Sequence, residues 1–172
     1  MTDRKLYVLR HAKSSWDDPG QHDRERPLAP RGRRAVKLIA THMRESGISP
    51  EQVLCSPARR TLETLEGVAP GGEALIEPEL YEASATEIIE RLWRVPDHVG
   101  SVMVVGHNPA MQTLVLRLVD ANGPRTSSAD LADVRRKFPT GALATLSFEC
   151  EWRELARGRA QLVSYARPKA LH

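Results

Sequence analysis

The segment Arg10-His11-Ala12 places an imidazole beside a guanidinium group, directly after an apolar run at residues 6–9. A histidine ring nitrogen can attack a phosphorus atom, and arginine presents a planar set of N–H donors that suits phosphoryl oxygens. Side by side, the two residue types therefore indicate phosphoryl transfer. Alone the tripeptide is weak support, because a chain of 172 residues with 25 lysines and arginines can contain it by chance.

Two further segments carry side chains of the same kind. The first, at 56–61, contains the neighbouring arginines Arg59 and Arg60, and the second, at 104–109, contains His107. Each follows an apolar run typical of a buried strand, and ligands of open α/β sheets collect outside the carboxyl ends of the strands. We therefore expect His11, His107 and one of the two arginines to meet at one edge of a sheet, and we predict a phosphatase.

The hydrophobic pattern predicts the elements that must position these side chains. Strands are predicted at residues 6–9, 52–55, 74–76, 101–105, 142–148 and 160–165. Helices are predicted at 30–46, at 58–66, after the capping box Ser84–Glu87, and from Asn108-Pro109 as N-cap and first helical residue. Residues 121–140 are predicted to be irregular.

Because strands and helices alternate, we expect one α/β domain over residues 1–172. Its architecture would be a three-layer α/β/α sandwich around a mainly parallel sheet. The two late strands would add antiparallel pairing at one edge.

The composition excludes several classes of protein. With 41% hydrophobic and 27% charged residues, the chain is typical of a globular protein. The net charge is only +3 and 5% of residues are aromatic, so we expect no nucleic-acid partner. The apolar runs are too short to span a bilayer, and no signal peptide is apparent, so we expect a cytoplasmic protein without a membrane association.

Neither cysteines nor carboxylates indicate a bound metal. Cys55 and Cys150 are too few for a disulfide framework or a zinc site, and Cys55 is predicted to be a buried free thiol. No cluster of carboxylates at metal-ligand spacing appears in the sequence. We therefore expect no metal and no other cofactor.

The order of the motifs resembles that of the histidine phosphatase superfamily, which includes the phosphoglycerate mutases. The resemblance to its SixA-type phosphohistidine phosphatase branch is closer still, and it covers about residues 6–148. The motifs that carry it are Arg10-His11-Ala12, Arg26-Pro27-Leu28 followed by Arg31-Gly32, Ser-Pro-x-x-Arg-x-x-x-Thr at 56–64, Gly106-His107-Asn108-Pro109 and Phe138-Pro139-Thr140-Gly141-Ala142.

The resemblance implies a role for five residues and a phosphoglycerate mutase-like fold. His11 would be the nucleophile that takes the phosphoryl group, and Arg10 and Arg60 would bind its oxygens. His107 would complete the pocket as a donor, and Arg26 matches a further phosphate-contacting arginine of the SixA-type branch. This agrees with the chemistry, because phosphoryl transfer requires alignment and positive charge around the equatorial oxygens.

Two other residues have competing interpretations. If the motif register is right, Arg59 is a surface charge and Arg60 the functional arginine. Glu82 falls where the wider superfamily carries its general acid, and we include it among the candidate catalytic residues. The alternative for Glu82 is a solvated carboxylate just before a helix N-terminus, where negative charge is favourable in any case.

The resemblance favours hydrolysis of phosphohistidine in a signalling protein by a monomeric enzyme. The chain has no long insertion between Thr64 and Ser84, which leaves a more open site that fits a protein side chain. One alternative is the hydrolysis of a small phosphoester. Another, from a different class, is a catalytically inactive module that binds phosphate or phosphoproteins.

Overall fold

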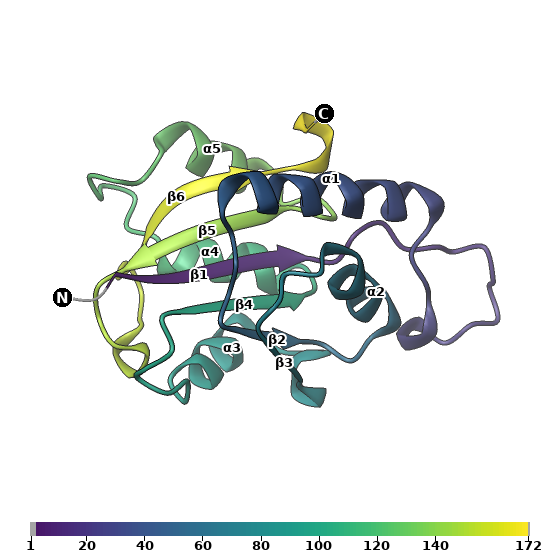
Figure 1. Cartoon of the computed structure of the whole chain (residues 1–172), viewed down its shortest axis with the longest axis horizontal. Coiled ribbons are helices and arrows are strands. Elements are labelled where there is room, and N and C mark those ends of the chain that lie inside the picture. Colours follow the sequence, from purple (N-terminus) through teal and green to yellow (C-terminus); the bar gives the residue numbers. More distant parts are fainter. Residues whose placement is uncertain (1–2, 172) are drawn as a thin grey trace.

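The computed structural model describes residues 3–171, which form one mixed sheet with helices on both faces (Figure 1). The strands are β1 Arg4–Arg10, β2 Gln52–Cys55, β3 Glu73–Ile76, β4 Ser101–Gly106, β5 Leu143–Phe148 and β6 Gln161–Ala166. Their order across the sheet is β3-β2-β4-β1-β5-β6. The pairs among β3, β2, β4 and β1 are parallel, whereas β5 is antiparallel to β1 and β6 to β5. The predicted α/β fold with late antiparallel strands is confirmed.

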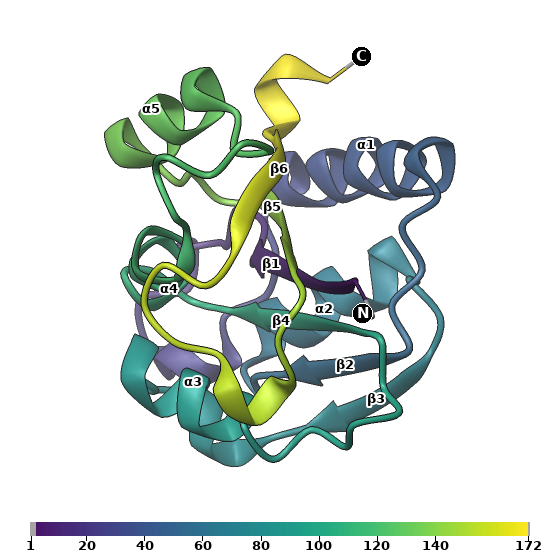
Figure 2. The same ribbon diagram turned by 90° about the vertical axis from the view of Figure 1, so that its left-hand side faces the viewer.

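The helices divide between the two faces of the sheet, as Figure 2 shows. They are α1 Pro30–Ser46, α2 Arg59–Val68, α3 Ala85–Leu92, α4 Ala110–Leu118 and α5 Ser128–Arg136. The helices α1 and α2 cover one face, and α3, α4 and α5 cover the other. The three predicted layers are therefore present. No helix within residues 3–171 has both the length and the apolar content needed to cross a membrane.

Each central strand supplies both hydrophobic cores. In β1, Leu6 and Val8 pack with residues of α3 and α4, while Tyr7 and Leu9 pack with residues of α1 and α2. Successive side chains of a strand point to opposite faces, so a strand covered on both sides favours apolar residues at every position. This explains the continuous apolar runs of β1 and β4, whereas the equally buried β5 includes the small polar residues Thr145 and Ser147.

Two expectations about local structure were wrong. Residues 121–140 contain helix α5, whose N-cap Ser127 accepts the Asp130 N–H at 3.2 Å and which buries Leu131 and Val134. The segment is mainly polar, so its two buried apolar residues did not produce a recognisable helical pattern in the sequence. Helix α4 begins at Ala110, with Pro109 and not Asn108 as its N-cap.

The segment after β1 is held close to two helices by small or polar residues. A Cβ atom on Gly32 of α1 would lie 2.1 Å from the Lys13 carbonyl oxygen, so only glycine permits this approach. On the other side, Thr64 of α2 accepts the Ala12 N–H at 3.0 Å and donates to the Arg60 carbonyl at 2.7 Å. The residues around His11 are therefore held between α1 and α2.

Candidate active site

The carboxyl ends of β1, β2 and β4 bring three of the predicted residues together. The ring centroids of His11 and His107 are 5.4 Å apart, and Arg60 Nη2 lies 3.4 Å from His107 Nδ1. The backbone N–H of His11 donates to the Gly106 carbonyl at 3.0 Å, which continues the pairing of β1 with β4. The expectation that these side chains meet at one edge of the sheet is confirmed.

His11 is buried and its ring is held in one tautomer. Its Nδ1 lies 2.7 Å from the Ala12 carbonyl oxygen, and because a carbonyl only accepts, Nδ1 carries the proton. The pKa of His11 is lowered to about 3, first because burial desolvates the charged ring and then because His107, Arg60 and Arg10 are close. At neutral pH the ring is therefore uncharged, and Nε2 has a free lone pair.

His107 uses both ring nitrogens within the protein. A guanidinium group only donates, so Nδ1 accepts from Arg60, and Nε2 carries the proton and donates to Ser56 Oγ at 2.7 Å. Burial and then the charge of Arg60 lower the pKa of His107 to about 4, while Asp23 acts in the opposite direction. In this state His107 has no spare N–H, so it becomes a donor at Nδ1 only after taking up a proton.

Arg10 and Arg60 approach the histidines with part of their donors still unpaired. Arg10 donates to the Phe138 carbonyl at 3.0 Å, and Arg60 donates to the backbone and the carboxylate of Asp23 at 2.8 and 3.1 Å. The buried Nε of each arginine has no partner among the described residues. Arg59, by contrast, is exposed and forms an ion pair with Glu63 at 3.0 Å. The structure thus places Arg60, and not Arg59, beside the histidines.

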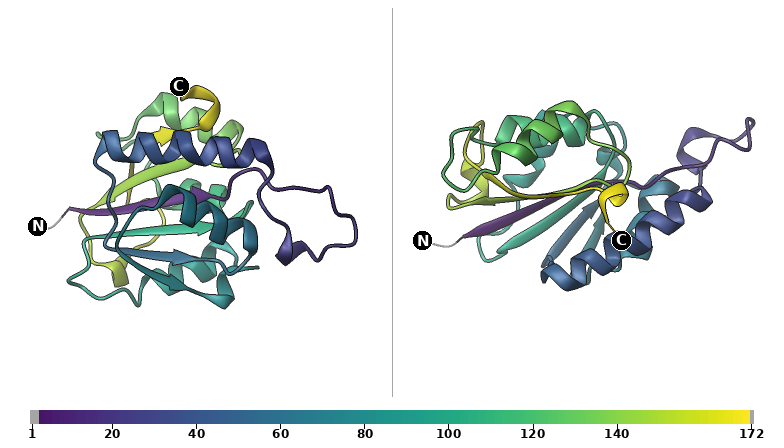
Figure 3. Two further views of the ribbon diagram at one scale, coloured as in Figure 1. Left: turned by 45° about the vertical axis from the view of Figure 1, so that its right-hand side comes forward. Right: turned by 90° about the horizontal axis from the view of Figure 1, so that it is seen from above.

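Asp23 is a central residue of this cluster that the sequence analysis missed. Its carboxylate accepts from Arg26 Nε at 3.2 Å, from Arg60 Nη2 at 3.1 Å and from the Tyr81 hydroxyl. These partners, Tyr81 first, hold the pKa of Asp23 at about 2. Asp23 lies in the segment that extends beyond the sheet edge between β1 and α1 (Figure 3). A carboxylate three residues before Arg26 was the available signal in the sequence.

Arg26 joins the cluster through Asp23. Arg26 is buried, donates to Ser14 Oγ at 2.8 Å, and its guanidinium carbon lies 3.5 Å from the ring centroid of Trp16. The Trp16 side chain is itself 69% exposed, which is unusual for tryptophan. Arg26 therefore lies between Asp23 and an exposed tryptophan, and the sequence analysis did not single out Trp16.

Glu82 does not join the cluster. It is exposed, and within residues 3–171 its carboxylate takes part in no hydrogen bond or ion pair. Its neighbour Tyr81 faces the site instead, with its ring centroid 5.7 Å from that of His107 and its hydroxyl bonded to Asp23.

The arrangement suits an anion and offers no metal centre in the described part of the chain. Within residues 3–171 no group of three His, Cys, Asp or Glu side chains is placed to hold a metal ion. Cys55 and Cys150 are free thiols, and burial raises the pKa of Cys55 to about 12. An uncharged imidazole surrounded by guanidinium groups can attack a phosphoryl group while its oxygens are held.

Comparison with known proteins agrees with this chemistry. The family model of the histidine phosphatase superfamily (branch 1) matches residues 6–93. An uncharacterized protein of Mycobacterium tuberculosis is 36% identical over 161 residues, which are 94% of this chain and all of the relative. Phosphohistidine phosphatase SixA of Escherichia coli is 27% identical over 151 residues, covering 84% of this chain and 86% of its own length.

A solved structure agrees over almost the entire chain. A protein of Nakamurella multipartitia, described as a phosphohistidine phosphatase SixA, is 30% identical, with a TM-score of 0.87 over 99% of both chains. The present chain therefore belongs to the histidine phosphatase superfamily. Within it the chain falls in the SixA-type branch, and it is a phosphatase.

The lowered pKa values predict how stability depends on pH. Histidine titrates near pH 6.5 in the unfolded chain, whereas the pKa values in the folded protein are about 3 for His11 and about 4 for His107. Between these pH values the unfolded state binds more protons than the folded state. The free energy of unfolding is therefore highest above about pH 6.5 and falls as the pH is lowered through this window. We expect the thermal midpoint, measured by circular dichroism, to fall from pH 7.5 to 4.5, and His11→Asn to reduce the slope. Equal slopes in both proteins would contradict the assignment of a buried, uncharged His11.

Proposed function

We propose that this phosphatase hydrolyses phosphohistidine in a protein, without a metal, through a phosphoryl group carried on His11. The observation that carries the proposal is the His11 ring, which is uncharged, anchored through Nδ1, and surrounded by guanidinium groups. The substrate is supported by the E. coli relative, whose name is phosphohistidine phosphatase SixA. Two free thiols are compatible with a reducing compartment, and we propose a cytoplasmic monomer.

The first step transfers the phosphoryl group to His11. Nε2 of His11 forms a bond to phosphorus while the bond from phosphorus to the substrate imidazole breaks, and the released imidazole takes a proton from water. Arg10 and Arg60 hold the phosphoryl oxygens, so their charge opposes the negative charge that is spread over those oxygens. In the second step water attacks phosphorus, inorganic phosphate leaves, and His11 returns to its uncharged form.

A bound phosphoryl group also changes His107 and Arg60. Its negative charge opposes the guanidinium charges that lower the pKa of His107, so that pKa rises and His107 takes up a proton at Nδ1. His107 then donates to a phosphoryl oxygen. Arg60 turns part of its donors from the half-exposed carboxylate of Asp23 to the phosphoryl group, which is the stronger acceptor.

Rapid quenching at alkaline pH should trap phosphate on His11. A phosphoramidate is stable in alkali and labile in acid, so the label should survive base and disappear in mild acid. Mass spectrometry of the labelled peptide is expected to locate the phosphate on His11 and to find none in His11→Asn. Label that resists acid, or that persists in His11→Asn, would show that another residue is the nucleophile.

The same assay tests metal independence. Turnover should continue in EDTA, since arginines supply the positive charge that metal ions supply elsewhere. Inhibition by EDTA that a divalent cation reverses would overturn this part of the proposal.

Substitution of neighbouring arginines provides a matched pair of variants. Arg60→Ala removes charge that faces the transition state, so we expect kcat/KM to fall on the order of a hundredfold or more. Arg59→Ala removes only an exposed ion pair with Glu63, so kcat/KM should stay within about threefold of wild type. Steady-state kinetics on one phosphohistidine substrate measures both. The reverse order of effects would place the phosphate beside Arg59.

Glu82 separates phosphohistidine from phosphoester hydrolysis. An alkoxide leaving group needs a proton in the transition state, whereas the phosphohistidine P–N bond breaks more easily and its imidazole is protonated from water near neutral pH. Glu82 is exposed and has no partner among the described residues, which favours phosphohistidine as the substrate. We therefore expect Glu82→Gln to keep phosphohistidine hydrolysis, measured by steady-state kinetics, within about tenfold of wild type.

The opposite pattern would identify another enzyme. If wild type prefers a small phosphoester and Glu82→Gln abolishes that activity, Glu82 is a general acid and the proposed substrate is wrong.

A further inference from the structure

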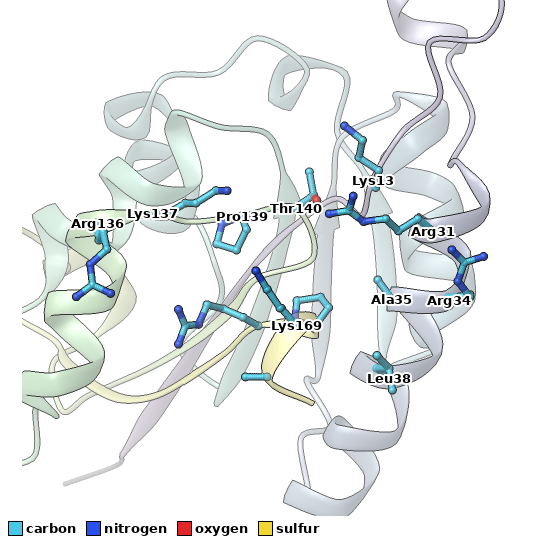
Figure 4. Close-up of a pocket in the computed structure, with 13 residues that line it drawn as sticks. Lys13, Arg31, Arg34, Ala35, Leu38, Arg136, Lys137, Pro139, Thr140 and Lys169 are labelled. Carbon is cyan, nitrogen blue, oxygen red and sulfur yellow. The ribbon is translucent and has the colours of Figure 1, made fainter. Parts of the chain in front are cut away.

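A basic pocket of about 670 Å³ lies between α1, the end of α5 and the C-terminal turn (Figure 4). Seven of its thirteen lining residues are lysine or arginine and none is acidic. Figure 4 shows Arg31 and Arg34 on the wall formed by α1, Arg136 and Lys137 on the opposite wall, and Lys169 between them. For a chain whose net charge is only +3, this is a strong local excess of positive charge.

Most of these charges have no counter-ion in the described part of the chain. Arg136 and Arg167 pair with Asp133, at 3.0 and 3.4 Å. The remaining five form no ion pair within residues 3–171 and are exposed: Lys13, Arg31, Arg34, Lys137 and Lys169. Nothing within the fold requires like charges to gather in this way, and their mutual repulsion opposes it.

The pocket adjoins the active site through two shared segments of backbone. Lys13 lies two residues after His11. On the other segment, the Phe138 carbonyl accepts from Arg10 at 3.0 Å, and Gly141 N–H donates to the His11 carbonyl at 2.9 Å. Pro139 and Thr140, between these two contacts, line the pocket. The pocket therefore lies next to the backbone that holds His11 and Arg10.

We propose that this pocket docks an acidic segment of the protein whose phosphohistidine enters the active site; the inference rests on the proposed function. The cations come from four separate parts of the chain and most are exposed, so they match carboxylates spread over a protein surface better than one compact anion. No aromatic side chain lines the pocket, whereas single-stranded nucleic acids bind largely by stacking on aromatic rings. The apolar side chains of Ala35, Leu38 and Pro168 offer contact to the rest of such a segment.

Exposed charges of this kind act mainly on association. Charge complementarity at the rim of an interface accelerates encounter, and salt screens it. The pocket should therefore raise kcat/KM for an acidic phosphoprotein and should not affect free phosphohistidine, which is too small to reach beyond the active site.

The test compares two substrates and two charge-reversed variants. The substrates are a histidine-phosphorylated protein with acidic residues around its phosphohistidine, and free phosphohistidine. Arg34→Glu/Lys169→Glu reverses two charges in the pocket. The matched control, Arg94→Glu/Arg157→Glu, reverses two exposed arginines that do not line it. Thermal unfolding and activity on free phosphohistidine establish that each variant is folded.

On the phosphoprotein, we expect the pocket variant to lose about tenfold or more in kcat/KM and the control to stay within about twofold of wild type. On free phosphohistidine all three proteins should agree within about twofold, and raising NaCl should remove the wild-type advantage. If wild type hydrolyses both substrates and the pocket variant matches the control, the docking surface is wrong and the proposed function stands. If wild type hydrolyses neither, the proposed function is wrong and the docking proposal falls with it.

A third experiment tests whether the pocket binds a small anion instead of a protein segment. Pyrophosphate is added during hydrolysis of free phosphohistidine. An effect on wild type that is absent from the pocket variant would identify a small-anion site and overturn the docking proposal. Equal effects on both proteins would support it.

Discussion

The parallel pairing of β1 with β4 is the constraint on which the candidate active site depends. It sets Arg10 opposite Gly106, so the residues that follow, His11 and His107, leave the sheet side by side. The pairing of β4 with β2 then brings Ser56 and the start of α2, with Arg60, to the same edge. A shift of one residue in the pairing of β1 would turn each of its side chains to the opposite face of the sheet. Because different residues pack in the two hydrophobic cores, such a shift is unfavourable, and the cores therefore stabilise this register.

Burial and charge then determine the state of the two histidines. Burial is the larger cause of the lowered pKa of both histidines, and the nearby arginines add to it, because a positive charge on either ring would lie close to theirs. Asp23 offsets part of this charge by accepting from Arg60, Arg26 and Tyr81 at once. Because its side chain is half exposed, Asp23 can release a donor to a phosphoryl group at little cost in solvation.

The distribution of charge links the active site to the surface around it. The net charge is only +3, but positive charge is concentrated in two neighbouring regions: the site, which has three arginines, and the pocket, which has seven lysines and arginines. The two regions differ in burial: Arg26 and Arg60 are buried and hydrogen-bonded in fixed positions, whereas most pocket cations are exposed. Buried, positioned charge suits a transition state, and exposed charge suits encounter with a partner.

The sequence by itself determined the strands, the α/β fold and the identity of His11, Arg10 and His107 as candidates, because apolar runs and strand-end motifs are local signals. It did not separate Arg59 from Arg60 without a family resemblance, and it did not reveal α5. The tertiary structure alone decided that Asp23 and Tyr81 join the site while Glu82 stays outside it, and that cations from four segments share one pocket. These outcomes depend on contacts between residues far apart in the chain, and on burial, which no local pattern records.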